Sequence, residues 1–122
     1  MKFTIYGNPI TKKNHGYIAM VKGHPIMLPS KQYQEYEKKA KEYMPDIDTI
    51  DYPIILKCNY FMEAKRKCDL VNLLQATCDV LVKYKIIEDD NYNIITSFDG
   101  SSVDYDKETP RAEIEIIKRE NN

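Results

Sequence analysis

The chain has 122 residues, with 18 lysines and arginines against 19 aspartates and glutamates. This length suits one domain with a single core, so we expect residues 1–122 to form a single domain. No stretch approaches the roughly 20 apolar residues of a membrane-spanning helix, and residues 2–6 resemble a strand rather than an apolar signal region. We therefore expect a cytoplasmic protein.

The cysteines do not indicate a metal centre or a disulfide framework. Cys58, Cys68 and Cys78 are odd in number and contain no Cys-x-x-Cys pair. His15 and His24 are the only histidines that could join them as soft ligands. We expect reduced thiols and no zinc site.

The formal net charge of −1 hides an uneven distribution of charge along the chain. Residues 1–44 hold eight lysines and three glutamates, whereas the remainder is acidic. Such a division suits a basic rim around an acidic floor, the combination that a metal-dependent nuclease needs because DNA is a polyanion. For Lys38, Lys39 and Lys41 we favour the simpler interpretation of a solvated helix face.

The first part of the chain predicts a strand, a hairpin and a helix. Residues 3–6 alternate and stop at the turn residues 7–9, and the apolar runs 17–21 and 25–28 flank a short connection that suits a hairpin. Ser30 is a suitable N-cap for the helix that follows. The apolar stripe of that helix consists of Tyr33, Tyr36, Ala40 and Tyr43. Tyrosines at this spacing are more typical of a core than of a base-stacking surface.

A polar loop with adjacent cations separates the first strand from the hairpin. It contains Lys12, Lys13, Asn14 and His15. The loop has two interpretations: an ordinary polar connection, or a clamp for phosphate groups. His15 alone is weak evidence for the second.

The second part of the chain predicts a strand, a helix and two more strands. Residues 54–62 are rich in β-branched and aromatic residues and are typical of a central strand. From Leu70 the apolar residues follow the i, i+3, i+4, i+7 spacing of a helix of about 15 residues. Strands are expected at residues 92–98 and 112–116, the last with isoleucines inward and glutamates outward.

These elements predict an α/β (α+β) fold, a mixed β-sheet with two main helices. A parallel crossover around the second helix would place Asp69 and Asp90 at opposite ends of an element roughly 22 Å long. An antiparallel arrangement, or a site completed across a dimer, would then be needed to unite them. The sequence leaves these alternatives open.

Carboxylates lie at both ends of the second helix. Asp69 directly precedes it and by itself indicates an N-cap, while Glu88, Asp89 and Asp90 follow it and by themselves indicate a solvated turn. The basic run of residues 65–67 directly precedes Cys68 and Asp69. Together these groups can bring metal-binding oxygens and phosphate-binding cations into one cleft, which is typical of a metal-dependent nuclease.

The segments 68–75, 79–81 and 86–90 resemble the RusA family of Holliday junction resolvases, and so do residues 6–14 and 28–33. The family signature is Asp-x-Asp-Asn at the start of this helix, a lysine one turn later and Asp-Asp after the helix. Asp69, Asn72, Asp89 and Asp90 match that signature. The resemblance implies a small homodimeric, Mg²⁺-dependent endonuclease of phage or prophage type that cuts branched DNA during recombination and repair.

The resemblance also implies roles for individual residues. Asp69 and Asp90 would be the catalytic metal ligands, with Asp89 as a further ligand, and the ion would be Mg²⁺ or alternatively Mn²⁺. The residues expected to contact DNA are Lys12, Lys13, Asn14, Lys65, Arg66, Lys67 and Asn72. Asn72 has the alternative role of orienting a neighbouring carboxylate.

Two departures from the signature fall in the site itself. Val71 stands where the family has its second Asp, and Gln75 stands where it has the lysine. Val71 supplies no oxygen, which would weaken the site or shift metal ligation to Asp89 or Asp99, and Gln75 removes a cation.

Three functions therefore stay open: an active junction endonuclease with a variant metal site, a junction-binding protein that has lost cleavage, and a small interaction protein that binds no DNA. The basic stretches at Lys12 and at residues 65–67 argue against the third.

Overall fold

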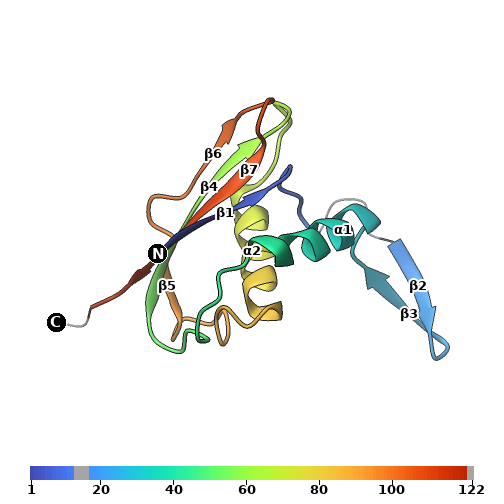
Figure 1. The fold of residues 1–122 in the computed structure, drawn as a ribbon. Coiled ribbons are helices and arrows are strands. Elements are labelled where there is room, and N and C mark those ends of the chain that lie inside the picture. Colours follow the sequence, from blue (N-terminus) through green and yellow to red (C-terminus); the bar gives the residue numbers. More distant parts are fainter. Residues whose placement is uncertain (13–16, 121–122) are drawn as a thin grey trace.

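The fold consists of one mixed sheet with two helices and a separate hairpin (Figure 1). The computed structural model describes residues 1–12 and 17–120. Its elements are β1 (Lys2–Tyr6), β2 (Tyr17–Val21), β3 (His24–Leu28), α1 (Lys31–Ala40), the 3₁₀ turn η1 (Lys41–Tyr43), β4 (Ile54–Met62), α2 (Leu70–Lys83), β5 (Ile95–Ser97), β6 (Ser102–Tyr105) and β7 (Arg111–Lys118). The predicted α/β fold class is confirmed. Among the described residues, no helix is long and apolar enough to cross a membrane.

Strand β4 is the centre of the sheet, as its composition predicts. The strand order is β1-β7-β4-β5, with β6 also paired to β4. β7 pairs antiparallel with both β1 and β4, whereas β5 and β6 pair parallel with β4 at successive points along it. The connection from β4 through α2 to β5 is therefore a parallel crossover.

The strands after α2 differ from the prediction in two ways. The strand predicted for residues 92–98 contains only Ile95–Ser97. The residues between Asn91 and β5 form a turn, since the carbonyl of Asn91 accepts from the N–H groups of Ile94 and Ile95. Strand β6 was not predicted at all, because its four residues, Ser-Val-Asp-Tyr, are too few and too polar to show a clear alternation.

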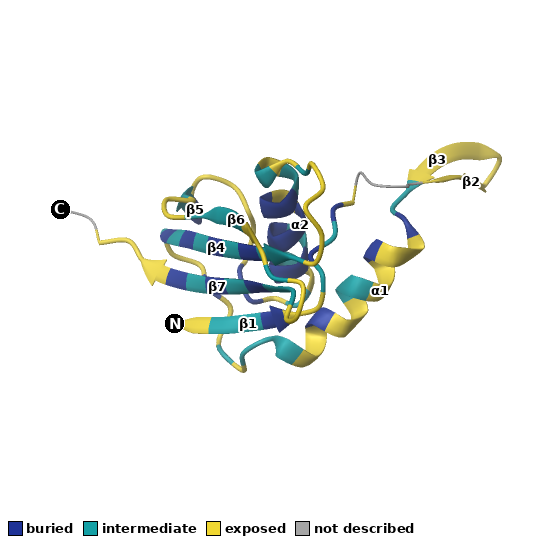
Figure 2. Cartoon of the chain, turned by 90° about the horizontal axis from the view of Figure 1, so that it is seen from above, coloured by how far each residue is buried: buried dark blue, intermediate teal, exposed yellow. Residues whose placement is uncertain are grey.

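Helix α2 packs against one face of the sheet and leaves the other face open (Figure 2). The side chains of β4 alternate, with Leu56, Cys58 and Tyr60 buried under the helix. The hydroxyl of Tyr60 donates to the carbonyl of Leu73 at 3.0 Å and lies 2.6 Å from the hydroxyl of Thr77, which ties the strand to the helix. The three cysteines are free thiols, and burial raises the pKa of Cys58 to about 12.

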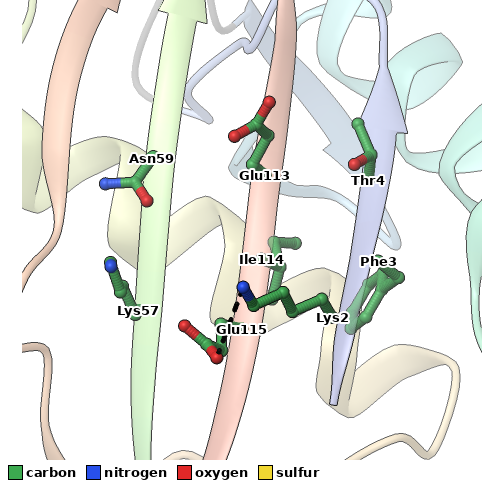
Figure 3. A pocket seen from close by; sticks show the side chains of 8 residues that line it. All are labelled: Lys2, Phe3, Thr4, Lys57, Asn59, Glu113, Ile114 and Glu115. Carbon is green, nitrogen blue, oxygen red and sulfur yellow. Dashed lines mark ion pairs between the residues drawn. The ribbon is translucent and has the colours of Figure 1, made fainter.

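The open face of the sheet is polar (Figure 3). It forms a shallow hollow of about 360 Å³ whose polar lining consists of Lys2, Thr4, Lys57, Asn59, Glu113 and Glu115. The ammonium group of Lys2 lies 4.0 Å from the carboxylate of Glu115. Glutamates outward and isoleucines inward on β7 confirm the predicted alternation.

Helix α1 begins at Ser30, whose hydroxyl accepts from the N–H of Tyr33 at 3.1 Å, as predicted for an N-cap. Tyr33 and Ala40 are buried, and Tyr36 and Tyr43 are partly buried against the core, which confirms that this stripe faces inward. Glu37 of α1 contacts the end of α2: its carboxylate pairs with Lys83 at 2.6 Å and its carbonyl accepts from Tyr84 at 2.7 Å.

The β2–β3 hairpin projects away from the sheet beyond α1 (Figure 1). Lys22 and Gly23 form its two-residue turn with φ angles of 50° and 79°, the left-handed geometry of a tight hairpin. The predicted hairpin is confirmed, although His24 starts β3 and is not in the turn. Ile18 and Met27 pair across the strands and are each about two-thirds exposed, at 67% and 68%.

Candidate metal and nucleic-acid site

A row of polar side chains runs along one side of α2. Asp69, Asn72, Gln75 and Asp79 follow each other at intervals of three or four residues, the spacing that keeps side chains on one side of a helix. The amide of Asn72 donates to the carboxylate of Asp69 at 3.3 Å. The amide of Gln75 donates to Asp79 Oδ1 at 3.2 Å.

Asp90 joins this row at its middle. The same Gln75 nitrogen donates to Asp90 Oδ2 at 3.1 Å. Gln75 is six residues after Asp69, which corresponds to about 9 Å of rise along the helix. The crossover is parallel, which was one of the alternatives that the sequence left open, and Asp90 nevertheless lies beside Gln75 in the middle of the helix.

The reason is the way in which α2 ends. Lys85 has a φ of 59°, and the N–H of Ile86 donates back to the carbonyl of Leu81 at 2.9 Å, the reversal known as a Schellman motif. Ile87 then forms a parallel bridge with Ile50. The chain folds back alongside the helix at once, and this return places Asp90 beside Gln75.

The carboxylate of Asp69 is not used as a helix cap. Asp69 occupies the N-cap position of α2 but makes no side-chain cap hydrogen bond. Instead it lines a hollow of about 150 Å³ together with Thr11, Lys67, Cys68 and Asn72. Its oxygens are therefore available for a ligand.

The basic run of residues 65–67 is divided between two places. Lys67 lines the hollow at Asp69 and also an adjacent one of about 380 Å³, which Arg66 borders as well. Lys65 turns the other way, with its ammonium group 5.1 Å from the centre of the Tyr105 ring. Lys67 thus lies beside Asp69 and Arg66 borders the adjacent hollow, while the DNA contacts expected of residues 65–67 stay a prediction.

Lys12, in the loop after β1, contacts the row at Asp79, the end opposite to Asp69. Its ammonium group pairs with Asp79 Oδ2 at 3.1 Å and lies 5.6 Å from the centre of the Tyr33 ring. Lys13 and Asn14, which the sequence suggested as DNA contacts, lie outside the described residues, as does His15. Their assignment stays a prediction.

Asp89 and Asp99 are the two residues that could replace the oxygen ligand missing at Val71, and within the described part of the chain neither forms a side-chain hydrogen bond with the row on α2. The carboxylate of Asp89 accepts from the N–H of Asp90 at 2.8 Å and from Asn91 at 2.9 Å, and these hydrogen bonds lower its pKa. Asp99 is in the turn after β5, where the next residue, Gly100, accepts from Asn59 on the open face of the sheet. A metal-binding role for Asp89 or Asp99 stays a prediction.

Asp79 is the member of the row to which sequence reasoning assigned no role. The sequence feature that could have identified Asp79 is its position four residues after Gln75, which places both side chains together on one side of a helix. The buried thiol of Cys78 lies near the same carboxylates: burial raises its pKa most, and the neighbouring acidic groups of Cys58, Asp90 and Asp79 raise it further.

The donor atoms of the row are all oxygens, supplied by Asp69, Asn72, Asp79 and Asp90. Within the described ranges, no three His, Cys, Asp or Glu side chains form a cluster that could hold a metal ion by themselves. Magnesium, however, is often held by one or two carboxylates together with waters and substrate phosphates. The residues therefore suit a hard cation in chemical type.

Comparison with known families gives a match to this chain. The family model described as "Endodeoxyribonuclease RusA" matches residues 6–117, which include the whole row on α2 and Asp90. No curated protein matches the chain.

The two helix caps predict different responses to truncation. Ser30→Ala removes a formed cap hydrogen bond and should lower the free energy of unfolding by about 1 kcal/mol. Asp69→Ala should lower it by much less, because no such bond is present. Urea denaturation of both variants measures the difference. An equal loss for Asp69→Ala would assign its carboxylate to helix capping.

Proposed function

The chain belongs to the RusA family of endodeoxyribonucleases, and from this membership we propose that it is a Mg²⁺-dependent, structure-selective endonuclease that resolves Holliday junctions. The observation that carries the proposal is the double hydrogen bond of Gln75, which holds Asp90 in the row that begins at Asp69. Two carboxylates from separate segments thereby share one side of α2, and Lys67 lines the hollow at one of them, Asp69.

Each residue of the row has a distinct part in this proposal. Asp69 and Asp90 would hold the metal ion, and Asn72 would orient the carboxylate of Asp69 through its 3.3 Å hydrogen bond. When bound, Mg²⁺ would supply an activated water and neutralise charge on the phosphate. Arg66 and Lys67 would bind the phosphates that flank the cut, since they border the hollow next to Asp69.

A second candidate function is a junction-binding protein of the same fold without cleavage. Two observations favour it. The side chain of Val71 is 74% exposed on the first turn of α2 and offers no oxygen. Gln75 contacts both Asp79 and Asp90 but carries no charge. In this second function the basic residues still grip the junction, and the carboxylates hold no ion.

We further propose that two copies of the chain act together. A four-way junction has two scissile strands related by approximate two-fold symmetry, and a symmetric dimer presents one site to each. The hairpin supports this proposal, because Ile18, Met20 and Met27 expose apolar surface on a two-stranded element that is marginally stable alone. A second copy would cover that surface.

Cleavage of synthetic four-way junctions with Mg²⁺ or Mn²⁺ tests the catalytic residues. Asp69→Asn should abolish cleavage while junction binding stays intact or tightens, because one negative charge leaves the site. Val71→Asp should raise cleavage by adding an oxygen beside Asp69. A fully active Asp69→Asn protein would refute the catalytic assignment.

An inert wild-type protein that gains activity through Val71→Asp would instead establish the second candidate function. Junction binding measured for the same variants separates a lost metal site from a lost fold.

The dependence of junction affinity on salt tests the basic residues. The pair Arg66→Ala and Lys67→Ala should weaken binding to every junction sequence alike and make log K less steep in log salt, by roughly 0.9 for each phosphate that the variant no longer binds. Lys2→Ala together with Lys57→Ala on the open face is the matched control and should leave the slope unchanged. Equal slopes for both pairs would remove Arg66 and Lys67 from the DNA-binding surface.

The mass of the protein in solution tests the proposed assembly. Light scattering at micromolar concentration and low salt should give twice the 14.3 kDa of one chain. Met20→Asp should shift the mass to a single chain, because it places a charge on the apolar hairpin surface, whereas Tyr92→Asp at an exposed site outside the hairpin should not. A wild-type mass of one chain would count against the dimer.

A further inference from the structure

The amide of Gln75 lies between two carboxylates without neutralising either. One nitrogen donates to Asp79 Oδ1 and to Asp90 Oδ2, at 3.2 and 3.1 Å. An amide satisfies hydrogen bonds but adds no positive charge. The row therefore keeps its negative charge at the place where a DNA phosphate, itself negative, would have to approach.

A cation from another part of the chain reaches the same group. Lys12 pairs with the second oxygen of Asp79 at 3.1 Å, so Asp79 is held by Gln75 on one side and by Lys12 on the other. The ammonium group also lies 5.6 Å from the ring centre of the buried Tyr33 on α1. Lys12 is thus placed by contacts from both helices, while 44% of its side chain stays exposed.

We propose that Lys12 supplies the positive charge of the site and that Gln75 is a positioning residue, which links this charge through Asp79 to Asp90. This inference rests on the proposed function. A lysine presents three donors on a flexible stem, so it can keep one bond to Asp79 and offer another to a phosphate oxygen. Charge placed beside the phosphate before the reaction stabilises the transition state.

The alternative is that Lys12 only fastens the loop after β1 to α2. Both interpretations include the 3.1 Å contact with Asp79, but they differ in whether the charge of Lys12 matters. Lys12→Gln separates them, because glutamine still donates a hydrogen bond to Asp79 and carries no charge. A fastening role predicts nearly normal behaviour for this variant.

The decisive test exchanges the two side chains. Lys12→Gln should lower kcat for junction cleavage on the order of tenfold with little change in KM. Adding Gln75→Lys should restore most of the lost activity, because a lysine at position 75 lies between Asp79 and Asp90. Adding Thr4→Lys instead restores the net charge on the open face of the sheet and should restore nothing.

A second readout does not depend on cleavage. Calorimetric titration with Mn²⁺ in the absence of DNA should show tighter binding to Lys12→Gln than to wild type, since one competing cation is gone, and Gln75→Lys in that background should return the affinity to the wild-type value. Lys2→Ala is the control for loss of a lysine elsewhere and should leave Mn²⁺ binding unchanged.

The two readouts distinguish the possible failures. A wild type that cuts no junction, with the expected order of Mn²⁺ affinities, refutes the proposed cleavage and supports the role of Lys12. Unchanged kcat and Mn²⁺ affinity in Lys12→Gln overturn the inference, and so does recovery by Thr4→Lys that equals recovery by Gln75→Lys. Thermal unfolding of each variant shows that it is folded, and Lys12→Arg, which keeps the charge, should behave as wild type.

Discussion

The site depends on how the chain turns after α2. Without the left-handed Lys85 and the hydrogen bond from Ile86 to Leu81, the segment after the helix would continue away from its far end. The parallel bridge between Ile50 and Ile87 fixes the returning segment at the sheet side. Asp90 then lies three residues beyond a buried, fixed position. A backbone reversal of a few residues thus places Asp90 beside Gln75 on the row that begins at Asp69.

The open face of the sheet and the side of α2 that carries Asp69 differ in the charged groups that they present. In the hollow on the open face of the sheet, the two lysines Lys2 and Lys57 are matched in number by the glutamates Glu113 and Glu115, and Lys2 pairs with Glu115. The side of α2 that carries Asp69 and Gln75 gathers oxygen ligands, and cations border it at both ends: Lys67 near Asp69, and Lys12 at Asp79. The net charge of −1 conceals this arrangement because the sum over the chain says nothing about position.

Much of the fold could be predicted because its signals are local. The alternation of β4, the periodicity of α2 and the cap at Ser30 are each visible within a few consecutive residues, and the structure confirms them. The short strand β6 was missed because its pairing partner is β4, more than forty residues away, and its own four residues carry almost no pattern. Its place in the sheet comes from the partner strand.

For the candidate site, the sequence determined which side chains are present and that Asp69, Asn72, Gln75 and Asp79 share one side of a helix, because helical spacing is fixed by local geometry. It also showed that Val71 offers no oxygen ligand and that Gln75 offers no cation. Only the tertiary structure decided that Asp90 and Lys12 join this row, because contacts between distant segments depend on how the whole chain packs. The contact between Asp69 and Asn72 belongs to the local part, because the two residues are three positions apart at the start of one helix, and the carboxylate of Asp69 accepts from Asn72 and makes no cap hydrogen bond.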